Sequence, residues 1–278
     1  MKIGANLEVA RGAECPFRDG VDRIAEIGYD YAEPCLSPGY DLFAEAGYFH
    51  MVSLEEDPLE YKEITDARGL TVESVSAHAP LMKPEASVHW LRDAINWVDQ
   101  WGGSVVNTDE GKQQPSWMDD EFAFEVMRYT LSKVAEAAER HEVHIAIEPH
   151  ARFTSDVETF TDLLNLVDSP YIGINYDTGN AYLQGNDPID YLEALGPERV
   201  VHLHAKDITV EQGEAERGEV TGTPVGCAVG DGVVDWHGVF SVLEDAGFDG
   251  VVSVEAGTFE EAEQSYSFLR SLSEEYSL

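Results

Sequence analysis

Short apolar runs alternate with longer amphipathic stretches from one end of the chain to the other. The apolar runs have the length and residue types of buried strands, and they lie at residues 2–6, 31–33, 71–77, 104–107, 144–148, 172–177, 200–206 and 250–255. The stretches between them repeat apolar residues with a helical period, at residues 17–27, 59–68, 87–101, 121–142, 156–167, 236–246 and 260–276. Glycines stand where four of these helices should end, at Gly28, Gly69, Gly102 and Gly247.

Eight strand–helix repeats without a linker predict an α/β protein with a single (β/α)8 TIM-barrel domain over residues 1–278. No GxGxxG motif follows a strand, which removes the main sign of a dinucleotide-binding open sheet. Two long segments after strands, residues 34–57 and 208–235, should lie on the catalytic face, where loops set substrate choice. Within the second, the charged run 210–218 indicates a solvated loop.

Four of the apolar runs end on residues that bind metals. These residues are Glu148, Asp177, His204 and Glu255. The first three are spaced by about one βα unit of roughly 30 residues, and the last lies beyond the long loop. Since the C-terminal ends of neighbouring barrel strands meet at one mouth, we expect the four side chains to converge there.

Side-chain alternation gives a second indication of the same site. Residues two apart on a strand share a face, so polar side chains of the last three strands point together into the barrel: Asn175, Asp177, His202, His204, Ser253 and Glu255. Buried polar groups are costly unless they are paired or bind metal. Three carboxylates and one imidazole suit Mn²⁺, with Mg²⁺ and Co²⁺ as alternatives. The other interpretation is that each is an interior polar group satisfied by hydrogen bonds.

The charge of the chain is extreme. It has 54 acidic and 17 basic residues, a formal net charge of −37, and only six of the basic residues are lysines. Such self-repulsion destabilises a compact state in dilute buffer and is screened in concentrated salt. The composition therefore favours a protein of a high-salt organism over an ordinary acidic enzyme. It also argues against nucleic-acid and anionic-membrane partners, which require lysine and arginine.

Cysteine usage and the N-terminal sequence indicate the compartment. Cys15, Cys35 and Cys227 are widely spaced and form no CxxC pair, which is typical of a reduced environment. The opening residues lack the apolar core of a signal peptide, and no run reaches the length of a membrane span. We therefore expect a cytoplasmic protein.

The motifs of nearly the whole chain resemble one family. In order they are GANLEVARG, IGYDYAEP, SAHAP, IEPH, NYDTGNAYLQG, VHLHAKD, GDGVVDW and VVSVEAG. The chain resembles the xylose-isomerase-like TIM barrels, a superfamily of sugar-phosphate isomerases and epimerases that includes ketose 3-epimerases and inosose dehydratases. The resemblance implies a divalent ion held by Glu148, Asp177, His204 and Glu255, with Glu148 and Glu255 also acting as the acid/base pair. It further implies a small-molecule sugar or polyol substrate and assembly into homodimers or homotetramers.

The implied chemistry is sound in physical terms. A hydrogen on the carbon next to a carbonyl is too weakly acidic to be removed unless the resulting enediolate is stabilised. A divalent ion on the carbonyl and hydroxyl oxygens supplies that stabilisation, and two carboxylates can remove and return the proton. We expect a sugar isomerase or epimerase. The alternatives are an inosose-type dehydratase on the same site and a non-catalytic sugar-binding barrel.

Three positions depart from the patterns of that superfamily. Asn180 stands where many relatives have a histidine, and Thr154 and Val210 stand where ketose epimerases have a glutamate and an arginine. These changes weaken the case for simple ketose 3-epimerisation and leave the dehydratase open. Asn107 and Asn180 also replace histidines that an AP endonuclease would need for its extra zinc ions.

Several residues near the expected mouth are candidates for binding substrate: Glu33, His78, His150, Arg152, Asn180 and Lys206. Glu33 ends the second strand and His78 follows the third, so either could face the mouth. Lys206 could hold a substrate oxygen or form a salt bridge with Asp207. His202 lies deeper and should support the site through hydrogen bonds. Two tryptophans, Trp117 and Trp236, could line a sugar pocket or pack in the loops.

Overall fold

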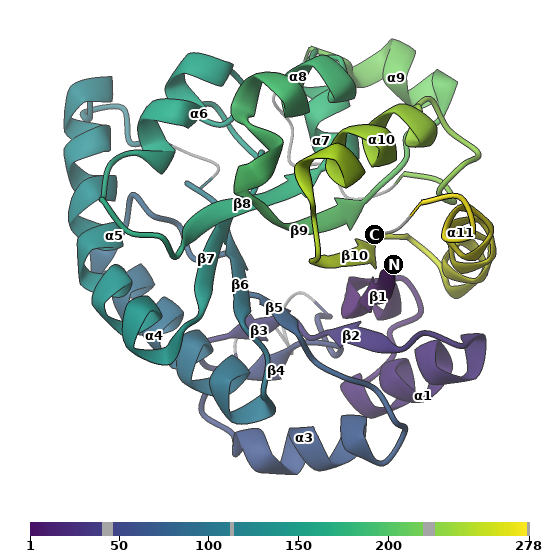
Figure 1. Ribbon diagram of the computed structural model, residues 1–278. Coiled ribbons are helices and arrows are strands. Elements are labelled where there is room, and N and C mark those ends of the chain that lie inside the picture. The colour runs from purple at the N-terminus through teal and green to yellow at the C-terminus, as the bar shows by residue number, and fades with distance from the viewer. Residues whose placement is uncertain (41–46, 112–113, 219–225, 277–278) are drawn as a thin grey trace.

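Eight parallel strands form a nearly closed barrel with helices around it (Figure 1). The computed structural model describes residues 1–40, 47–111, 114–218 and 226–276. The barrel strands, in the order in which they pair, are β2 (Tyr31–Glu33), β1 (Lys2–Asn6), β10 (Val251–Val254), β9 (Val200–Ala205), β8 (Ile172–Asp177), β7 (His144–Ile147), β6 (Val105–Thr108) and β5 (Ser74–Ser76). The prediction of a (β/α)8 barrel is confirmed.

The two ends of this sheet, β2 and β5, are joined by a few backbone contacts. Isolated parallel bridges link Tyr31 to Thr71 and Cys35 to Ser76. The amide of Ala32 donates to the carbonyl of Thr71 at 2.9 Å, which lies before the regular part of β5. The predicted strand 71–77 therefore has a regular ladder only over its central residues, and isolated bridges close the barrel beside it.

The helices begin and end at residues suited to those positions. They are α1 (Phe17–Ile27), α3 (Pro58–Asp66), α4 (Pro84–Trp101), α5 (Asp120–His141), α6 (Val157–Leu164), α7 (Thr178–Leu183), α8 (Pro188–Leu195), α9 (Val210–Glu216), α10 (Trp236–Ala246) and α11 (Phe259–Leu272), with 3-10 turns η1 (Leu7–Ala10) and η2 (Pro197–Arg199). Asp119 caps α5 by accepting from the amide of Phe122 at 2.9 Å. Gly28, Gly102 and Gly247 adopt left-handed conformations at helix C-caps, as predicted.

Several elements differ from the sequence prediction. The helices α7 and α8 were not predicted, and a two-stranded parallel pair, β3 (Leu36–Ser37) with β4 (Val52–Ser53), lies within the long 34–57 segment. The prediction of a solvated loop over 210–218 is wrong for its first seven residues, which form α9. Thr209 caps this helix by accepting from the amide of Gln212, and Gly213 is buried. Local capping therefore outweighs the polar composition there.

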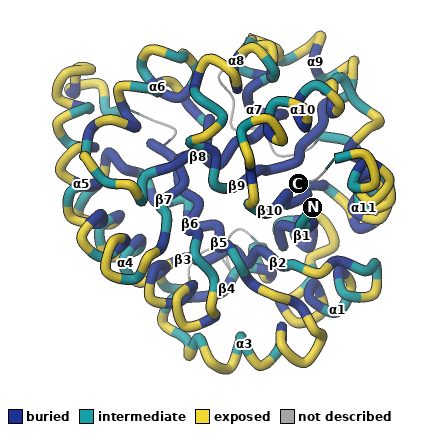
Figure 2. Tube along the Cα trace, viewed as in Figure 1, coloured by how far each residue is buried: buried dark blue, intermediate teal, exposed yellow. Residues whose placement is uncertain are grey.

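The core lies between the barrel and its helices (Figure 2). Apolar strand residues such as Leu203 and Val252 are fully buried. Tyr176 is also buried, and its hydroxyl donates to the carbonyl of Pro188 in α8, so this side chain points outward from the barrel. Outward packing of Tyr176 leaves its neighbours Asn175 and Asp177 for the interior, as the alternation predicts.

Asp207 organises the loop that follows β9. Its carboxylate accepts from the amides of Ile208, Gly230, Gly232 and Val234 and from the indole N–H of Trp236, at 2.9–3.2 Å. Trp236 is only 2% exposed. It therefore packs inside the loop and does not line a sugar pocket.

The substitution Asp207→Asn should destabilise the protein by about 2–4 kcal/mol, because its amide group would face donors that need an acceptor. Denaturant unfolding of the two proteins measures this difference in the free energy of unfolding. Asp231→Asn, at an exposed position of the same loop, is the control and should change stability little. A loss below about 0.5 kcal/mol for Asp207→Asn would show that the loop forms without this carboxylate.

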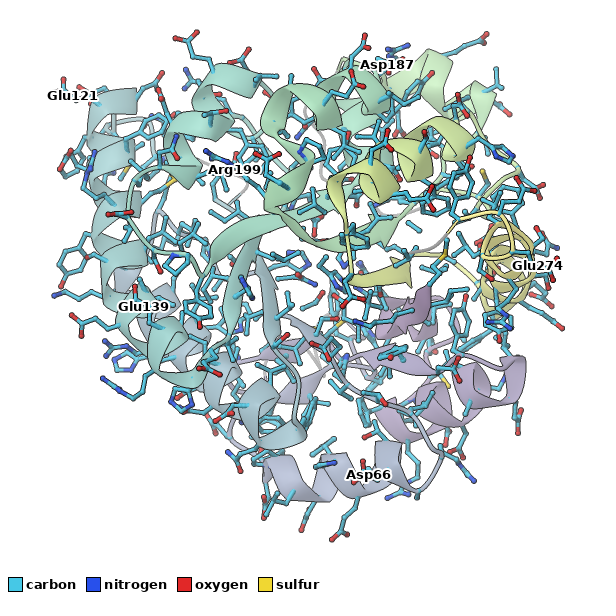
Figure 3. All side chains as sticks on the ribbon, viewed as in Figure 1. Asp66, Glu121, Glu139, Asp187, Arg199 and Glu274 are labelled. Carbon is cyan, nitrogen blue, oxygen red and sulfur yellow. The ribbon has the colours of Figure 1, made fainter. Side chains whose placement is uncertain are left out.

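Acidic side chains surround the outside of the barrel (Figure 3). Asp66, Glu121, Glu139 and Glu274 all lie on the outer rim in this view. Asp66 has a partner, Lys62, at 2.7 Å. Because acidic residues outnumber basic ones by 54 to 17, at most 17 of them can have a lysine or arginine of their own. Among the described helices, none is long and apolar enough to cross a membrane.

Candidate metal centre

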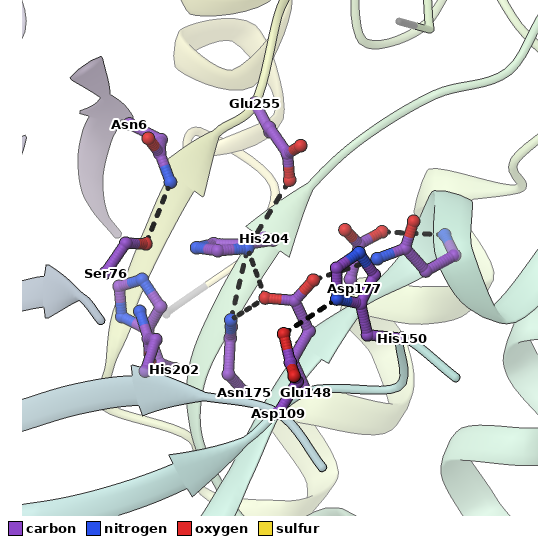
Figure 4. Close-up of polar contacts among 12 residues, drawn as sticks. Asn6, Ser76, Asp109, Glu148, His150, Asn175, Asp177, His202, His204 and Glu255 are labelled. Atoms are coloured by element: carbon purple, nitrogen blue, oxygen red, sulfur yellow. Dashed lines mark hydrogen bonds and ion pairs between the residues drawn. The ribbon is translucent and has the colours of Figure 1, made fainter. Parts of the chain in front are cut away.

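The four predicted ligands converge at the C-terminal mouth of the barrel. Glu148 follows β7, Asp177 ends β8, His204 lies in β9 and Glu255 follows β10. One ligand atom from each residue lies within 4.8 Å of the other three (Figure 4). Neighbouring parallel strands thus bring residues that are distant in sequence to one place. We call Glu148, Asp177, His204 and Glu255 the four-ligand cluster.

His204 lies between the two glutamates of this cluster. Its Nδ1 is 3.2 Å from Oε2 of Glu148 and 3.5 Å from Oε2 of Glu255. Oδ1 of Asp177 accepts from the amide of Asn180 at 2.8 Å, whereas Oδ2, which is buried, accepts no hydrogen bond from a described residue. A buried carboxylate oxygen without a donor is costly, so this atom fits the position of a cation ligand.

Lys206 adds a positive charge beside the cluster. Its Nζ lies 2.8 Å from Oε1 of Glu255, 3.7 Å from Oδ2 of Asp177 and 3.3 Å from Oδ1 of Asn180. The ion pair with Asp207 that the sequence left open is not formed, because Asp207 is occupied by its loop. With Glu148, Asp177 and Glu255 ionised and His204 neutral, as metal binding requires, the three carboxylates and the ammonium carry a charge of about −2, which a divalent cation would balance.

The electrostatics of the cluster reflect this surplus of negative charge. Burial raises the pKa of Asp177 to about 7 against the opposing effect of Lys206, and the charges of Glu255 and Glu148 add to the rise. Burial also acts to raise the pKa of Glu148, but His204 outweighs it and holds that pKa at about 2. The neighbouring carboxylates raise the pKa of His204 as well, so a divalent cation would compete with protons for Asp177 and His204.

Glu33 lies beneath the cluster and not at its mouth. Its Oε1 is 2.9 Å from Nε2 of His204, and its Oε2 is 2.9 Å from Nε2 of His202. Ser76 and Asn107 also donate to Oε1, and Glu33 is 1% exposed. The prediction that Glu33 faces substrate is therefore corrected: its oxygens are used to fix the two histidines. A carboxylate on the far nitrogen is the usual support for a metal-binding histidine.

Two asparagines hold Glu148 in place. Asn180 donates to Oε1 at 2.9 Å, and Asn175 donates to Oε2 at 3.0 Å. Asn180, a predicted substrate residue, thus contacts Glu148 and Asp177 of the four-ligand cluster and Lys206 beside it. These contacts fix the carboxylate before any substrate arrives.

His78 and His150 are brought together by a residue that the sequence analysis missed. Nδ1 of His78 and Nδ1 of His150 lie 3.0 and 2.8 Å from the same oxygen, Oδ2 of Asp109, and the ring centres are 5.6 Å apart. Asp109 directly follows β6. The sequence pattern that could have predicted it is therefore an acidic residue at the end of a strand, as for the predicted ligands. These three residues form a second polar group at the mouth, and they could also hold a metal ion.

Arg152 is not part of either group. Its guanidinium makes two hydrogen bonds, at 2.8 and 2.6 Å, to the carboxylate of Asp120 at the start of α5, and its side chain is 62% exposed. Trp117 is 72% exposed and contacts Phe122. Neither residue makes a contact with the four-ligand cluster in the described part of the chain.

Glu110 is buried next to Asp109. It accepts from the amides of Phe153 and Thr154 and from the hydroxyl of Thr154 at 2.8–3.2 Å. Burial, with the charge of Asp109, raises the pKa of Glu110 from an ordinary value of 4.5 to about 7. Because the folded state holds this proton more tightly, its contribution to stability is complete below pH 4.5 and is lost as the pH rises through 7.

The substitution Glu110→Gln should remove this pH dependence, because the amide keeps an acceptor without a charge. Between pH 5 and pH 8 the free energy of unfolding of the parent protein should fall by roughly 2 kcal/mol relative to the variant. Denaturant unfolding at both pH values measures it, with the exposed Glu121→Gln as the control. Parallel pH profiles of parent and Glu110→Gln would contradict the assignment.

Known proteins share this architecture and parts of the sequence. Inosose dehydratase of Lacticaseibacillus casei is 24% identical over 269 residues, covering 88% of this chain and 83% of the relative. The crystal structure of a D-tagatose 3-epimerase-like protein has a TM-score of 0.76 at 22% identity and covers 99% of this chain and 97% of that one. The IolI protein with a bound zinc atom has a TM-score of 0.76 at 18% identity, with full coverage of both chains.

The family model agrees with the resemblance in the motifs. It is described as the xylose isomerase-like TIM barrel, and it matches residues 21–272, which include the barrel strands from β2 to β10 and all four convergent ligands. With the barrel and the strand-end cluster in place, the match shows that this chain belongs to the xylose isomerase-like TIM barrel family.

Proposed function

We propose that this protein is a divalent-metal-dependent enzyme that removes a proton from the carbon next to a carbonyl in a sugar or polyol ketone. The observation that carries the proposal is the four-ligand cluster, with its buried Asp177 oxygen that accepts no hydrogen bond from a described residue. The zinc atom in the related IolI structure supports a divalent ion. Mn²⁺ is the expected ion, with Mg²⁺ and Co²⁺ as alternatives.

The donor set fits such an ion. Glu148, Asp177, His204 and Glu255 would hold it, and when bound it supplies positive charge where negative charge develops on the substrate oxygens. Glu33 fixes the ring of His204 by a contact of 2.9 Å. The hydrogen bonds to Glu33, Glu148 and Asp177 thus preorganise the site before substrate binds.

The two glutamates are the proposed acid/base pair. They approach Nδ1 of His204 from separate strands, β7 and β10, so substrate bound over the cluster would have a carboxylate on each side. One takes the proton, and the other returns one to the opposite face, which inverts the carbon centre. Lys206, 2.8 Å from Glu255, is the proposed ligand of a substrate oxygen, and His78 and His150 are candidates for binding hydroxyl groups.

A dehydratase is the second candidate, because the inosose dehydratases are similar over most of the chain. The reaction would begin with the same proton removal, and the C–O bond of a β-hydroxyl would then break and release water. Thr154 and Val210 are consistent with it. Thr154 is buried and bonded to Glu110, and Val210 is 63% exposed, so neither supplies the charged group found in ketose epimerases.

Incubation with keto-sugars and inososes in D₂O, with added Mn²⁺, tests the proposal. An isomerase or epimerase should exchange one carbon-bound hydrogen for deuterium and otherwise conserve the mass, whereas a dehydratase should release water. NMR and mass spectrometry of the products distinguish the two. A chelator should stop either reaction. Sugar binding without hydrogen exchange or loss of water across the panel would favour a non-catalytic barrel and contradict the proposal.

A further inference from the structure

A second set of metal-type side chains lies near the ends of β1 and β2. It comprises Glu8 in η1, Cys35 just after β2 and His50 just before β4. One ligand atom from each lies within 4.8 Å of the other two. This set, which we call the Glu8–Cys35–His50 cluster, shares no residue with the four-ligand cluster.

His50 is the member that points to a missing ligand. It is 1% exposed, yet neither of its ring nitrogens has a hydrogen-bond partner among the described residues. A buried imidazole needs a partner for each nitrogen, and leaving one without a partner costs free energy. A cation shared with Cys35 and Glu8 would satisfy one of the two nitrogens.

The neighbours of the cluster leave its donors available. Sγ of Cys35 lies 3.3 Å from Oδ1 of Asn6, the only hydrogen bond of this thiol to a described side chain. Arg11 binds Oε1 of Glu8 at 2.9 Å, and a carboxylate can bind a guanidinium with one oxygen and a cation with the other. Deprotonation of the thiol on binding would provide the third donor.

The donor types select the class of cation. One sulfur, one nitrogen and one oxygen ligand suit Zn²⁺ or Co²⁺ and not the harder Mn²⁺ or Mg²⁺. Three protein ligands with an open fourth position are the arrangement of catalytic zinc sites. We propose that Glu8, Cys35 and His50 form a second, zinc-type cation site whose fourth position is open to water or a ligand oxygen.

The two clusters are neighbours through Asn6. Its Oδ1 faces Cys35, and its Nδ2 donates to Glu33 at 3.4 Å, the carboxylate that supports His204. The second site is thus built beside the first, on the opposite side of Asn6. Its existence does not depend on the proposed reaction.

Titration of the full chain with Co²⁺ tests the proposal. Since the four-ligand cluster contains no sulfur, a thiolate-to-cobalt charge-transfer absorption reports only the second site. We expect at least two Co²⁺ ions per chain and this absorption in the parent protein. The substitution Cys35→Ser should abolish the absorption and lower the bound Co²⁺ by one ion per chain, whereas Cys15→Ser and Cys227→Ser, at cysteines outside the cluster, should leave both readouts unchanged.

A second variant controls for the case in which Cys35→Ser fails to fold. His50→Gln should weaken Co²⁺ binding at the second site while circular dichroism shows an intact fold. Asp177→Asn should lose the ion of the first site and keep the sulfur absorption, which separates failure of this proposal from failure of the proposed function. Absence of the absorption in the parent protein at saturating Co²⁺, or its persistence in Cys35→Ser, would overturn the second site.

Discussion

Replacing Glu255 by glutamine is expected to slow exchange of the substrate's carbon-bound hydrogen by roughly 10²–10⁴-fold. Glutamine keeps the shape of the side chain but can neither accept nor return a proton at neutral pH. Lys206 also loses its carboxylate partner at 2.8 Å, which adds to the loss. The rate of deuterium incorporation from D₂O, measured at saturating Mn²⁺ so that metal binding is not limiting, gives the effect directly.

The matched control for this experiment is Glu260→Gln. Glu260 lies five residues further along the chain, at the exposed start of α11, and should retain full activity. The corresponding change at the other glutamate, Glu148→Gln, should cause a loss of similar size, because the two carboxylates act in one proton transfer. An exchange rate in Glu255→Gln within threefold of the parent would remove Glu255 from the acid/base pair.

Raising NaCl from about 0.1 M to about 1 M should raise the Tm by on the order of 10 °C. With a net charge of −37 and acidic residues around the outer rim, like charges repel across the folded surface more than in the expanded unfolded chain. The Debye length falls from about 10 Å to about 3 Å over this range, so most of that repulsion is screened. Differential scanning calorimetry measures the shift.

Sucrose provides the control for the salt experiment, because it favours compact states by exclusion from the surface and not by screening. Electrostatic screening should give a Tm that rises steeply at low salt and levels off near 1 M. A Tm that is unchanged or lower at 1 M NaCl would contradict the interpretation of the acidic surface as an adaptation to concentrated salt.

The positions of the four predicted ligands could be inferred from sequence, because strands that follow one another along the chain are neighbours in a barrel. Glu148, Asp177, His204 and Glu255 each end an apolar run, and parallel strands bring such ends to one mouth. No knowledge of side-chain conformation is needed for that inference. The same argument, applied to the residue after β6, would have found Asp109.

The sequence could not predict how deep in the barrel a strand-end side chain lies, nor which residue it contacts. Glu33 also ends a strand, but its carboxylate is drawn beneath His204 by donors from five other residues, a result of tertiary packing alone. Arg152 lies close in sequence to Glu148, yet its loop directs it to Asp120. The Glu8–Cys35–His50 cluster depends on the path of the long segment after β2, for which the sequence has no periodic pattern.

Anomalous scattering from a crystal soaked in Mn²⁺ tests most directly whether the four strand ends hold one cation. We expect a single strong manganese peak within coordination distance of Glu148, Asp177, His204 and Glu255, and its disappearance in Asp177→Asn. A fully soaked crystal with no peak between these side chains, or with manganese bound only elsewhere, would contradict a metal centre at the barrel mouth.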